Sequence, residues 1–144
     1  SRRVERECRE RAMAALERVG VQRYADRPIR ELPFGVQKRV DIARALVTQP
    51  SLVLLDEPMA GLTRPEKDEV MDVLEQLRET QGPTLIIVEH DMRVVSRLAS
   101  SVVVLAAGTV LAQGHPTDVL NRPDVVEAYL GKGHDAPAGG DGRV

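Results

Sequence analysis

The sequence has few aromatic side chains, one cysteine and no long apolar segment. Phenylalanine, tyrosine and tryptophan together make up 2% of its 144 residues, so any core must be built from leucine, valine, isoleucine and alanine. The single Cys8 excludes an internal disulfide framework and a multi-cysteine zinc site, and we expect it to be a small packed residue. The longest apolar run, 102–107, is far shorter than the ~20 residues of a membrane-spanning helix. These absences favour a soluble globular chain.

An excess of charge of one sign is also lacking. There are 20 basic and 22 acidic residues, and the formal net charge is −2. With 42% hydrophobic and 29% charged residues, the chain is too apolar for wholesale disorder and too evenly charged for a nucleic-acid-binding tail. We therefore expect no nucleic-acid partner. Because the sequence begins with Ser1 rather than Met, at the edge of an expected helix, we also expect the chain to be part of a longer protein.

The first 50 residues read as mainly helical. Apolar residues at helical spacing predict an amphipathic helix over 3–19, which Gly20 ends. A polar connection with two prolines follows over 20–34. A second helix is expected from about residue 35 to 47, before Pro50.

The next segment alternates between strands and helices. Residues 51–56 and 84–88 are continuous apolar runs, which predict two strands buried on both faces. Helices are expected over 65–80 and 91–99. This order indicates an α/β fold with a parallel sheet and right-handed crossovers.

Short elements and a tail end the sequence. Residues 102–112 predict a hairpin that turns at Ala107 and Gly108. Two short helices are expected over 116–120 and 123–130. Residues 132–144 have no periodicity and are expected to be a disordered tail.

Two acids stand where the first predicted strand leaves the sheet. In open α/β sheets, ligands bind beyond the carboxyl ends of the strands. Asp56 at that point can hold Mg²⁺, which prefers oxygen ligands, and Glu57 can orient or deprotonate a water that attacks a phosphoryl group. The alternative is a core strand that ends in a solvated, charged turn.

His90 and Gly35 add two further candidates. His90 follows the second predicted strand, where a neutral imidazole can hydrogen-bond a γ-phosphate and the attacking water. Gly35 stands at a predicted helix start, whose N–H groups and dipole attract anions. Taken singly, His90 also fits an ordinary surface or cap histidine, and Gly35 an ordinary turn.

Along the sequence, the helix start at Gly35, the acidic strand end at Asp56-Glu57 and the strand end at His90 follow one another. In this order they resemble the second half of the nucleotide-binding domain of the ATP-binding cassette (ABC) family. Residues 32–37 fall where the family signature lies. Residues 52–56 match the Walker B strand, Glu57 the general-base position, 59–63 the D-loop and His90 the switch histidine.

The resemblance implies a P-loop NTPase-like α/β fold that binds ATP and Mg²⁺. Residues 1–50 would form the helical subdomain with the signature segment, and 51–131 the C-terminal part of the nucleotide-binding core. It implies catalytic roles for Glu57 and His90 and metal binding by Asp56. It also implies nucleotide contacts across a dimer by Pro33, Phe34, Gly35, Val36, Gln37, Gly61, Leu62 and Thr63.

The amino-acid sequences of the motifs are most similar to those of branched-chain amino-acid importer ATPases. This applies to residues 32–39, 56–62 and 88–92, and to the closing run over 125–131. The resemblance implies a subunit of an ATP-hydrolysing importer, peripheral on the cytoplasmic face of the membrane. Its partners would be a homologous or identical ATPase subunit and transmembrane permease subunits.

Three departures from the family pattern leave alternatives open. Pro33-Phe34-Gly35 replaces the usual Ser-Gly-Gly, and Thr63 replaces Asp or Asn. No G-x-x-x-x-G-K-[ST] phosphate loop is present in these residues. We therefore expect a fragment without that loop. One alternative is a non-catalytic interaction module or truncated product that docks on a membrane partner, and another is a soluble, non-transport ABC ATPase.

Overall fold

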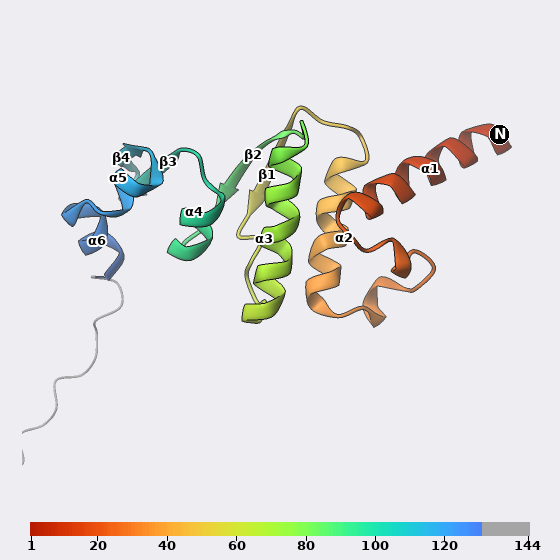
Figure 1. Ribbon diagram of the computed structural model, residues 1–144, viewed down its shortest axis with the longest axis horizontal. Helices are drawn as coiled ribbons and strands as arrows, with labels where there is room; N and C mark the ends of the chain where they lie inside the picture. The colour runs from red at the N-terminus through yellow and green to blue at the C-terminus, as the bar shows by residue number, and fades with distance from the viewer. Residues whose placement is uncertain (131–144) are drawn as a thin grey trace, which may run out of the picture. The chain divides into compact units, whose positions relative to one another are not determined.

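The computed structural model describes residues 1–130, and the expected tail over 132–144 lies outside this range. The chain divides into two compact units, the first covering Ser1–Asp91 and the second beginning at Met92. Figure 1 shows the order of elements along the chain. Within the described residues, no helix is both long enough and apolar enough to cross a membrane.

Three helices make up most of the first unit. They are α1 (Arg2–Arg18), α2 (Phe34–Leu46) and α3 (Arg64–Glu79). α1 packs against α2, and α2 lies beside α3 (Figure 1). The polar connection after α1 contains two 3₁₀ turns, η1 (Gln22–Tyr24) and η2 (Ile29–Glu31). The helices predicted over 3–19, 35–47 and 65–80 are thus confirmed to within one residue at each end.

The apolar stripe of α1 is only partly covered. Ala15 and Val19 near its end are buried, whereas Val4 is 57% exposed. Cys8 is also exposed, so the expectation that it is a packed residue is wrong. The reason is that the contacts of α1 within its unit lie towards its C-terminal end, and the earlier turns project beyond them (Figure 1).

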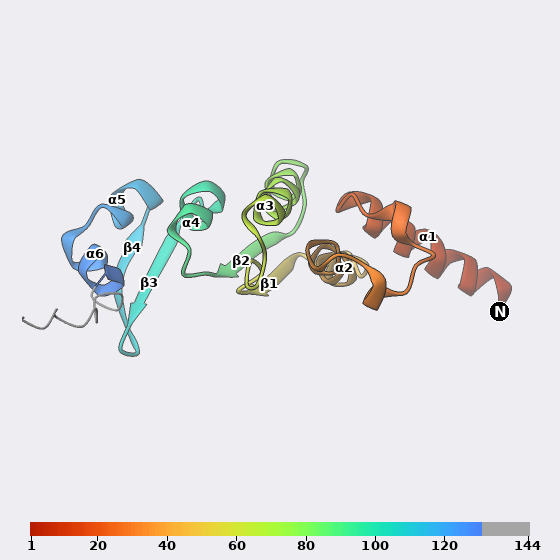
Figure 2. The same cartoon turned by 90° about the horizontal axis from the view of Figure 1, so that it is seen from below.

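Two parallel strands complete the first unit. β1 (Leu52–Asp56) pairs with β2 (Thr84–Val88) in a parallel register that sets Asp56 opposite Val88. The parallel pairing confirms the sequence prediction. Figure 2 shows α3 lying over one face of the strand pair, where Val70, Leu74 and Leu77 of the helix are buried.

The other face of the strand pair is uncovered within the first unit. Its side chains lie in register, and Leu54 is 69% exposed and Ile86 51% exposed. The prediction that both strands are buried on both faces is therefore wrong for this structure. Their runs are apolar on both faces, but residues 1–91 supply a cover, α3, for only one of them.

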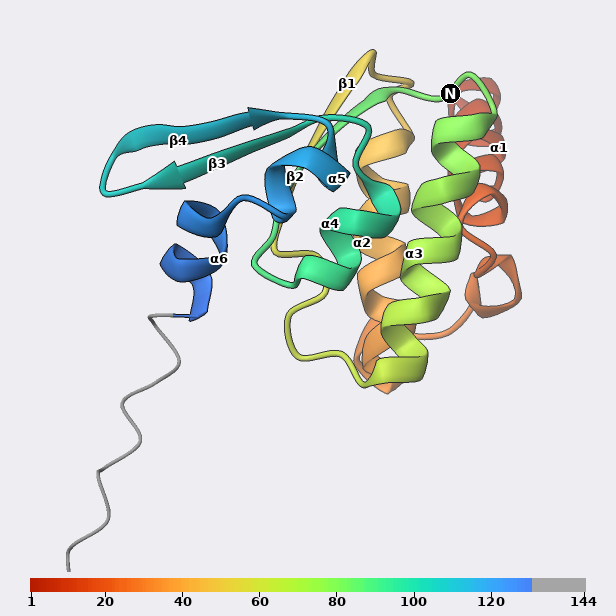
Figure 3. The same ribbon diagram turned by 60° about the vertical axis from the view of Figure 1, so that its left-hand side comes forward.

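The second unit is a hairpin with short helices. Its antiparallel strands are joined by a two-residue turn in which Ala107 and Gly108 both have positive φ, 48° and 77°, as in the common type I′ hairpin turn. Figure 3 shows the extended hairpin with the short helix α5 (Pro116–Leu120) beside it. Val104, Ala112, Val119 and Val125 form its core. The elements are α4 (Met92–Leu98), β3 (Val102–Ala106), β4 (Thr109–Gly114), α5 (Pro116–Leu120) and α6 (Pro123–Leu130).

Candidate functional site

The carboxyl ends of β1 and β2 bring Glu57 next to the second strand. Its backbone N–H donates to the carbonyl oxygen of Val88 at 2.8 Å. Glu57 has φ +44°, a conformation that is uncommon for residues other than glycine and persists where surrounding contacts hold it. The backbone of Glu57 is therefore held in place by the neighbouring strand.

Glu57 and His90 are hydrogen-bonded to each other. The Nδ1 atom of His90 lies 3.0 Å from Oε1 of Glu57. Both side chains are accessible to solvent, with 73% of His90 and 49% of Glu57 exposed. When Nδ1 carries the proton, it donates to the carboxylate, and Nε2 is then a hydrogen-bond acceptor. Two residues chosen separately from the sequence thus form one acid–imidazole pair.

The neighbours of His90 tie its segment to the turn after β1 and to α3. Glu89 accepts hydrogen bonds from the backbone N–H groups of Met59, at 3.1 Å, and His90, at 3.3 Å. Lys67 forms an ion pair with Asp91, with 3.1 Å between Nζ and Oδ2. Glu89, Lys67 and Asp91 are not candidates from the sequence, because the Met59–Glu89 and Lys67–Asp91 contacts join positions 30 and 24 residues apart and no local pattern marks them.

Asp56 is compatible with a magnesium site in which the protein supplies only one carboxylate ligand. Asp56 is exposed and is the last residue of β1. Among residues 1–130, no group of three or more His, Cys, Asp or Glu side chains could hold a metal ion. Mg²⁺ in phosphoryl-transfer sites is commonly held by one or two carboxylates together with water and substrate phosphates. A single carboxylate at this position is compatible with that mode.

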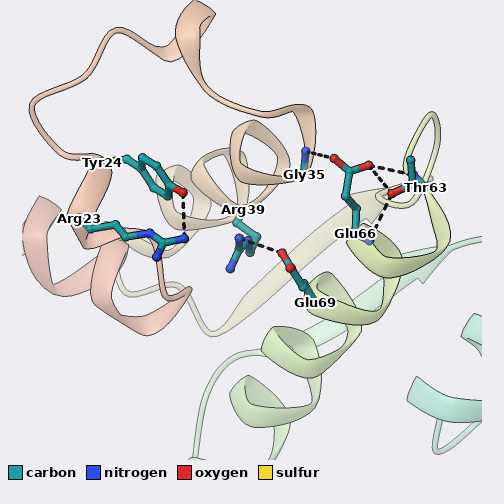
Figure 4. Close-up of polar contacts among 7 residues, drawn as sticks. All are labelled: Arg23, Tyr24, Gly35, Arg39, Thr63, Glu66 and Glu69. Carbon is teal, nitrogen blue, oxygen red and sulfur yellow. Dashed lines mark hydrogen bonds and ion pairs between the residues drawn. The ribbon is translucent and has the colours of Figure 1, made fainter.

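The predicted signature segment forms the start of α2. Pro33 is the N-cap residue and supplies no side-chain cap. The side-chain amide of Gln37 donates to the carbonyl of Leu32 at 2.9 Å, which closes the turn before the helix. The N–H of Gly35, considered above as an anion contact, donates to Oε1 of Glu66 at 3.2 Å. In this structure, a carboxylate of the chain itself therefore occupies that donor (Figure 4).

Glu66 also caps its own helix. The backbone N–H and the hydroxyl of Thr63 donate to Oε2 of Glu66 at 2.8 and 2.9 Å, and the Thr63 hydroxyl accepts from the N–H of Glu66. These contacts make a capping box at the start of α3. The N–H of Thr63, then its hydroxyl, and then the N–H of Gly35 lower the pKa of Glu66 below its ordinary value. A Thr-x-x-Glu pattern before an apolar run is a known capping signal, so the sequence contained the clue to Glu66.

Gly61 and Phe34 give a second contact between the same two segments. Gly61 has φ +76°, and a Cβ atom there would lie 3.0 Å from Cε1 of Phe34. Phe34 is 46% exposed, and Nζ of Lys38 lies 5.3 Å from its ring centroid. The structure therefore brings the 33–37 and 61–63 segments together, while Asp56, Glu57 and His90 gather at the strand ends.

The structure places this acid–imidazole pair at the carboxyl ends of a parallel strand pair, which is where open α/β sheets bind their ligands. The family model for ABC transporters matches residues 2–60, and that for branched-chain amino acid ATP-binding cassette transporters matches residues 109–135. The chain belongs to the ATP-binding cassette transporter ATPase family.

Similar curated proteins are ATP-binding proteins of amino-acid transport. LivG of Escherichia coli (strain K12), a high-affinity branched-chain amino acid transport ATP-binding protein, is 41% identical over 131 residues, which are 91% of this chain and 51% of LivG. BraF of Pseudomonas aeruginosa, with the same description, is 40% identical over the same shares. The chain thus spans about half the length of the curated relatives it matches.

Solved structures confirm the fold class. The ADP conformation of MJ1267, an ATP-binding cassette of an ABC transporter, matches with a TM-score of 0.79 and 32% identity over 87% of this chain and 50% of that chain. CbiO1 from Clostridium perfringens, part of the ABC transporter complex cbiONQ, matches with a TM-score of 0.75 and 38% identity over 85% of this chain and 48% of that chain. The P-loop NTPase-like α/β fold inferred from the motifs is therefore correct.

Proposed function

We propose that this chain is the C-terminal part of an ATP-binding and ATP-hydrolysing subunit of an ABC transporter that powers branched-chain amino-acid uptake. The observation that carries the hydrolytic part is the hydrogen-bonded pair of Glu57 and His90 beside Asp56. The descriptions of LivG and BraF support the proposed cargo.

In this proposal the chain contributes a base, an orienting imidazole and one metal ligand. Glu57 accepts a proton from the water that attacks the γ-phosphoryl group. His90 holds the Glu57 carboxylate through Nδ1–H. As an imidazolium, with Nε2 also protonated, it would donate a second hydrogen bond to a phosphate oxygen. Asp56 would hold Mg²⁺, which neutralises developing phosphate charge when bound.

The second group of residues would act between two subunits. Pro33–Gln37 and Gly61–Thr63 form adjoining segments, and we propose that they close on the nucleotide of a homologous or identical partner subunit. The complete subunit would attach to transmembrane permease subunits at the cytoplasmic face of the membrane. CbiO1, described as part of a transporter complex, supports an assembly of this kind.

Exchange of the proposed base tests the hydrolytic role. In the complete subunit, Glu57→Gln keeps the shape of the side chain but removes the proton acceptor, so ATP turnover should fall on the order of 10²-fold or more while ATP still binds. Glu89→Gln is the matched control, since Glu89 stands at the neighbouring strand end and contacts backbone N–H groups instead of His90 Nδ1. Turnover near that of the parent in Glu57→Gln would refute the role.

A non-catalytic interaction module remains the second candidate. It is favoured by the absence of a G-x-x-x-x-G-K-[ST] pattern from the 144 residues, since that loop normally cradles the nucleotide phosphates. The two candidates differ in one respect that is easily observed: a phosphate-loop motif encoded in frame upstream of Ser1 supports the ATPase subunit, and a start codon at that point supports the module.

A further inference from the structure

One carboxylate connects the two segments that the proposed function places at the subunit interface. Oε1 of Glu66 accepts the N–H of Gly35 at the start of α2, at 3.2 Å. Oε2 accepts the N–H and the hydroxyl of Thr63, at 2.8 and 2.9 Å. Figure 4 shows Glu66 lying between these two residues. A capping glutamate ordinarily serves its own helix, whereas this one uses its second oxygen for another element.

The close approach depends on glycine at position 35. A Cβ atom on Gly35 would lie 3.0 Å from Cγ, 3.1 Å from Cβ and 3.2 Å from Oε1 of Glu66. A side chain there would therefore require Glu66 to shift by a few tenths of an ångström. Gly61, where a Cβ would meet the Phe34 ring at 3.0 Å, shows that the same two segments also touch beside this link.

The link also suits the electrostatics of the helix start. Glu66 places a negative charge at the amino end of α2, where the helix dipole favours one. Pro33, the N-cap residue, has no side-chain donor or acceptor to do this. Glu66 thus supplies from α3 the cap that the sequence of α2 lacks.

We propose that Glu66 is a positioning residue that fixes the spacing between the start of α2 and the loop at Gly61–Thr63. Since the Gly35 N–H donates to Glu66, this carboxylate would set how the two segments lie at the proposed subunit interface, and the Gly35 N–H would not itself contact the nucleotide while the link is formed. The role towards nucleotide rests on the function proposed above. The shared carboxylate has a direct structural consequence. A substitution at Thr63 should weaken the hydrogen bond between the Gly35 N–H and Glu66, because both residues are bound by the same carboxylate.

Amide hydrogen exchange in the 144-residue chain tests this coupling without any nucleotide. Thr63→Ala should speed exchange at Gly35 by severalfold, and Glu66→Ala by about tenfold, the scale of one hydrogen bond. In the Glu66→Ala background, Thr63→Ala should have no further effect on Gly35. Glu69→Ala is the matched control, because Glu69 also joins α3 to α2, through Arg39 at 3.0 Å, yet does not contact either loop. Unchanged exchange at Gly35 in Glu66→Ala, or an equal change in Glu69→Ala, would overturn the proposal.

Steady-state kinetics of the complete subunit then tests the positioning role. Glu66→Ala should lower kcat for ATP by about ten- to a hundredfold, since a displacement of about 1 Å in a site has effects of this size, and should leave KM within about twofold. Glu66→Gln keeps one acceptor oxygen, so its kcat should lie between those of the parent and of Glu66→Ala. A kcat equal to the parent's in Glu66→Ala overturns the proposal.

The two failures are distinguishable. A parent subunit that does not hydrolyse ATP, with the exchange coupling intact, would refute the proposed function and with it the role of Glu66 towards nucleotide. An active parent with no coupling between Thr63 and Gly35 would refute the role of Glu66 alone.

Discussion

At the scale of single residues, Glu66 should make the stability of the fold depend measurably on pH. Its pKa is lowered from an ordinary value of 4.5 by hydrogen bonds from Thr63 and Gly35. A carboxyl with a lowered pKa in the folded state stabilises the fold above its ordinary pKa, and this contribution is lost as the pH falls through the lowered value. The parent chain should therefore melt at a higher temperature than Glu66→Gln at pH 7, and the difference should close as the pH falls below 4.5 and through the lowered pKa of Glu66.

Thermal unfolding of the two proteins across this pH range is the measurement. Glu69→Gln is the control, because the partner of the Glu69 carboxylate is the Arg39 side chain instead of backbone N–H groups. A melting difference between parent and Glu66→Gln that does not change with pH would contradict the charge-based origin of the link.

The residues at the strand ends could be chosen from the sequence because position follows from the pattern. An apolar run that ends in Asp56-Glu57, followed by a second run that ends before His90, places these side chains at one edge of a parallel pair. Their roles stay predictions. The contacts of Glu89 and Asp91 could not be predicted, because they depend on how α3 and the loops fold back across 24 to 30 residues.

At the scale of elements, the two faces of β1 should respond differently to the same change. Leu54 is 69% exposed and Val53 is 5% exposed, and they are neighbours on one strand. Leu54→Thr should cost less than about 0.5 kcal/mol of unfolding free energy, as surface changes do, and should reduce aggregation of the 144-residue chain. Val53→Thr buries a hydroxyl among apolar side chains and should cost about 1–3 kcal/mol.

Urea unfolding and light scattering of both variants check this pair. A large loss of stability in Leu54→Thr would mean that something covers this face of β1 in the isolated chain. The same comparison can be made on β2, where Ile86 lies in register with Leu54 and is 51% exposed.

The element boundaries were predictable because the local signals are strong. Gly20, Pro50, the apolar periodicity and the turn at Ala107-Gly108 mark starts and stops that the structure reproduces closely. Burial was not predictable from the same signals. A continuous apolar run shows that both faces of a strand can be buried, but the covering partner of the second face is not specified by the run itself.

At the scale of the whole molecule, the 144-residue chain by itself should not turn over Mg-ATP. It contains Asp56, Glu57 and His90 but no phosphate-loop pattern, and that loop supplies the lysine and backbone groups that hold the β- and γ-phosphates. Phosphate release by the purified chain should match that of its Glu57→Gln variant. Steady turnover that disappears in Glu57→Gln would show that the chain holds nucleotide by other means.

At this scale, the fold and the family could be predicted from the order of the motifs, whereas the partners' contact surfaces could not. The chain matches proteins about twice as long over about half of their length, so the match identifies the part without describing the rest of the assembly. The surface that would bind the proposed permease subunits is marked by no local pattern in residues 1–130.

The central claim, that Glu57 is the base of an ATPase whose two subunits close on ATP, is tested most directly by trapping. The complete subunit with Glu57→Gln is mixed with Mg-ATP and its size is measured by size-exclusion chromatography, with Glu89→Gln as control. The account predicts a stable dimer for Glu57→Gln with ATP, a monomer without it, and no accumulated dimer for Glu89→Gln. A Glu57→Gln subunit that hydrolyses ATP like the parent, or stays monomeric with ATP bound, would contradict it.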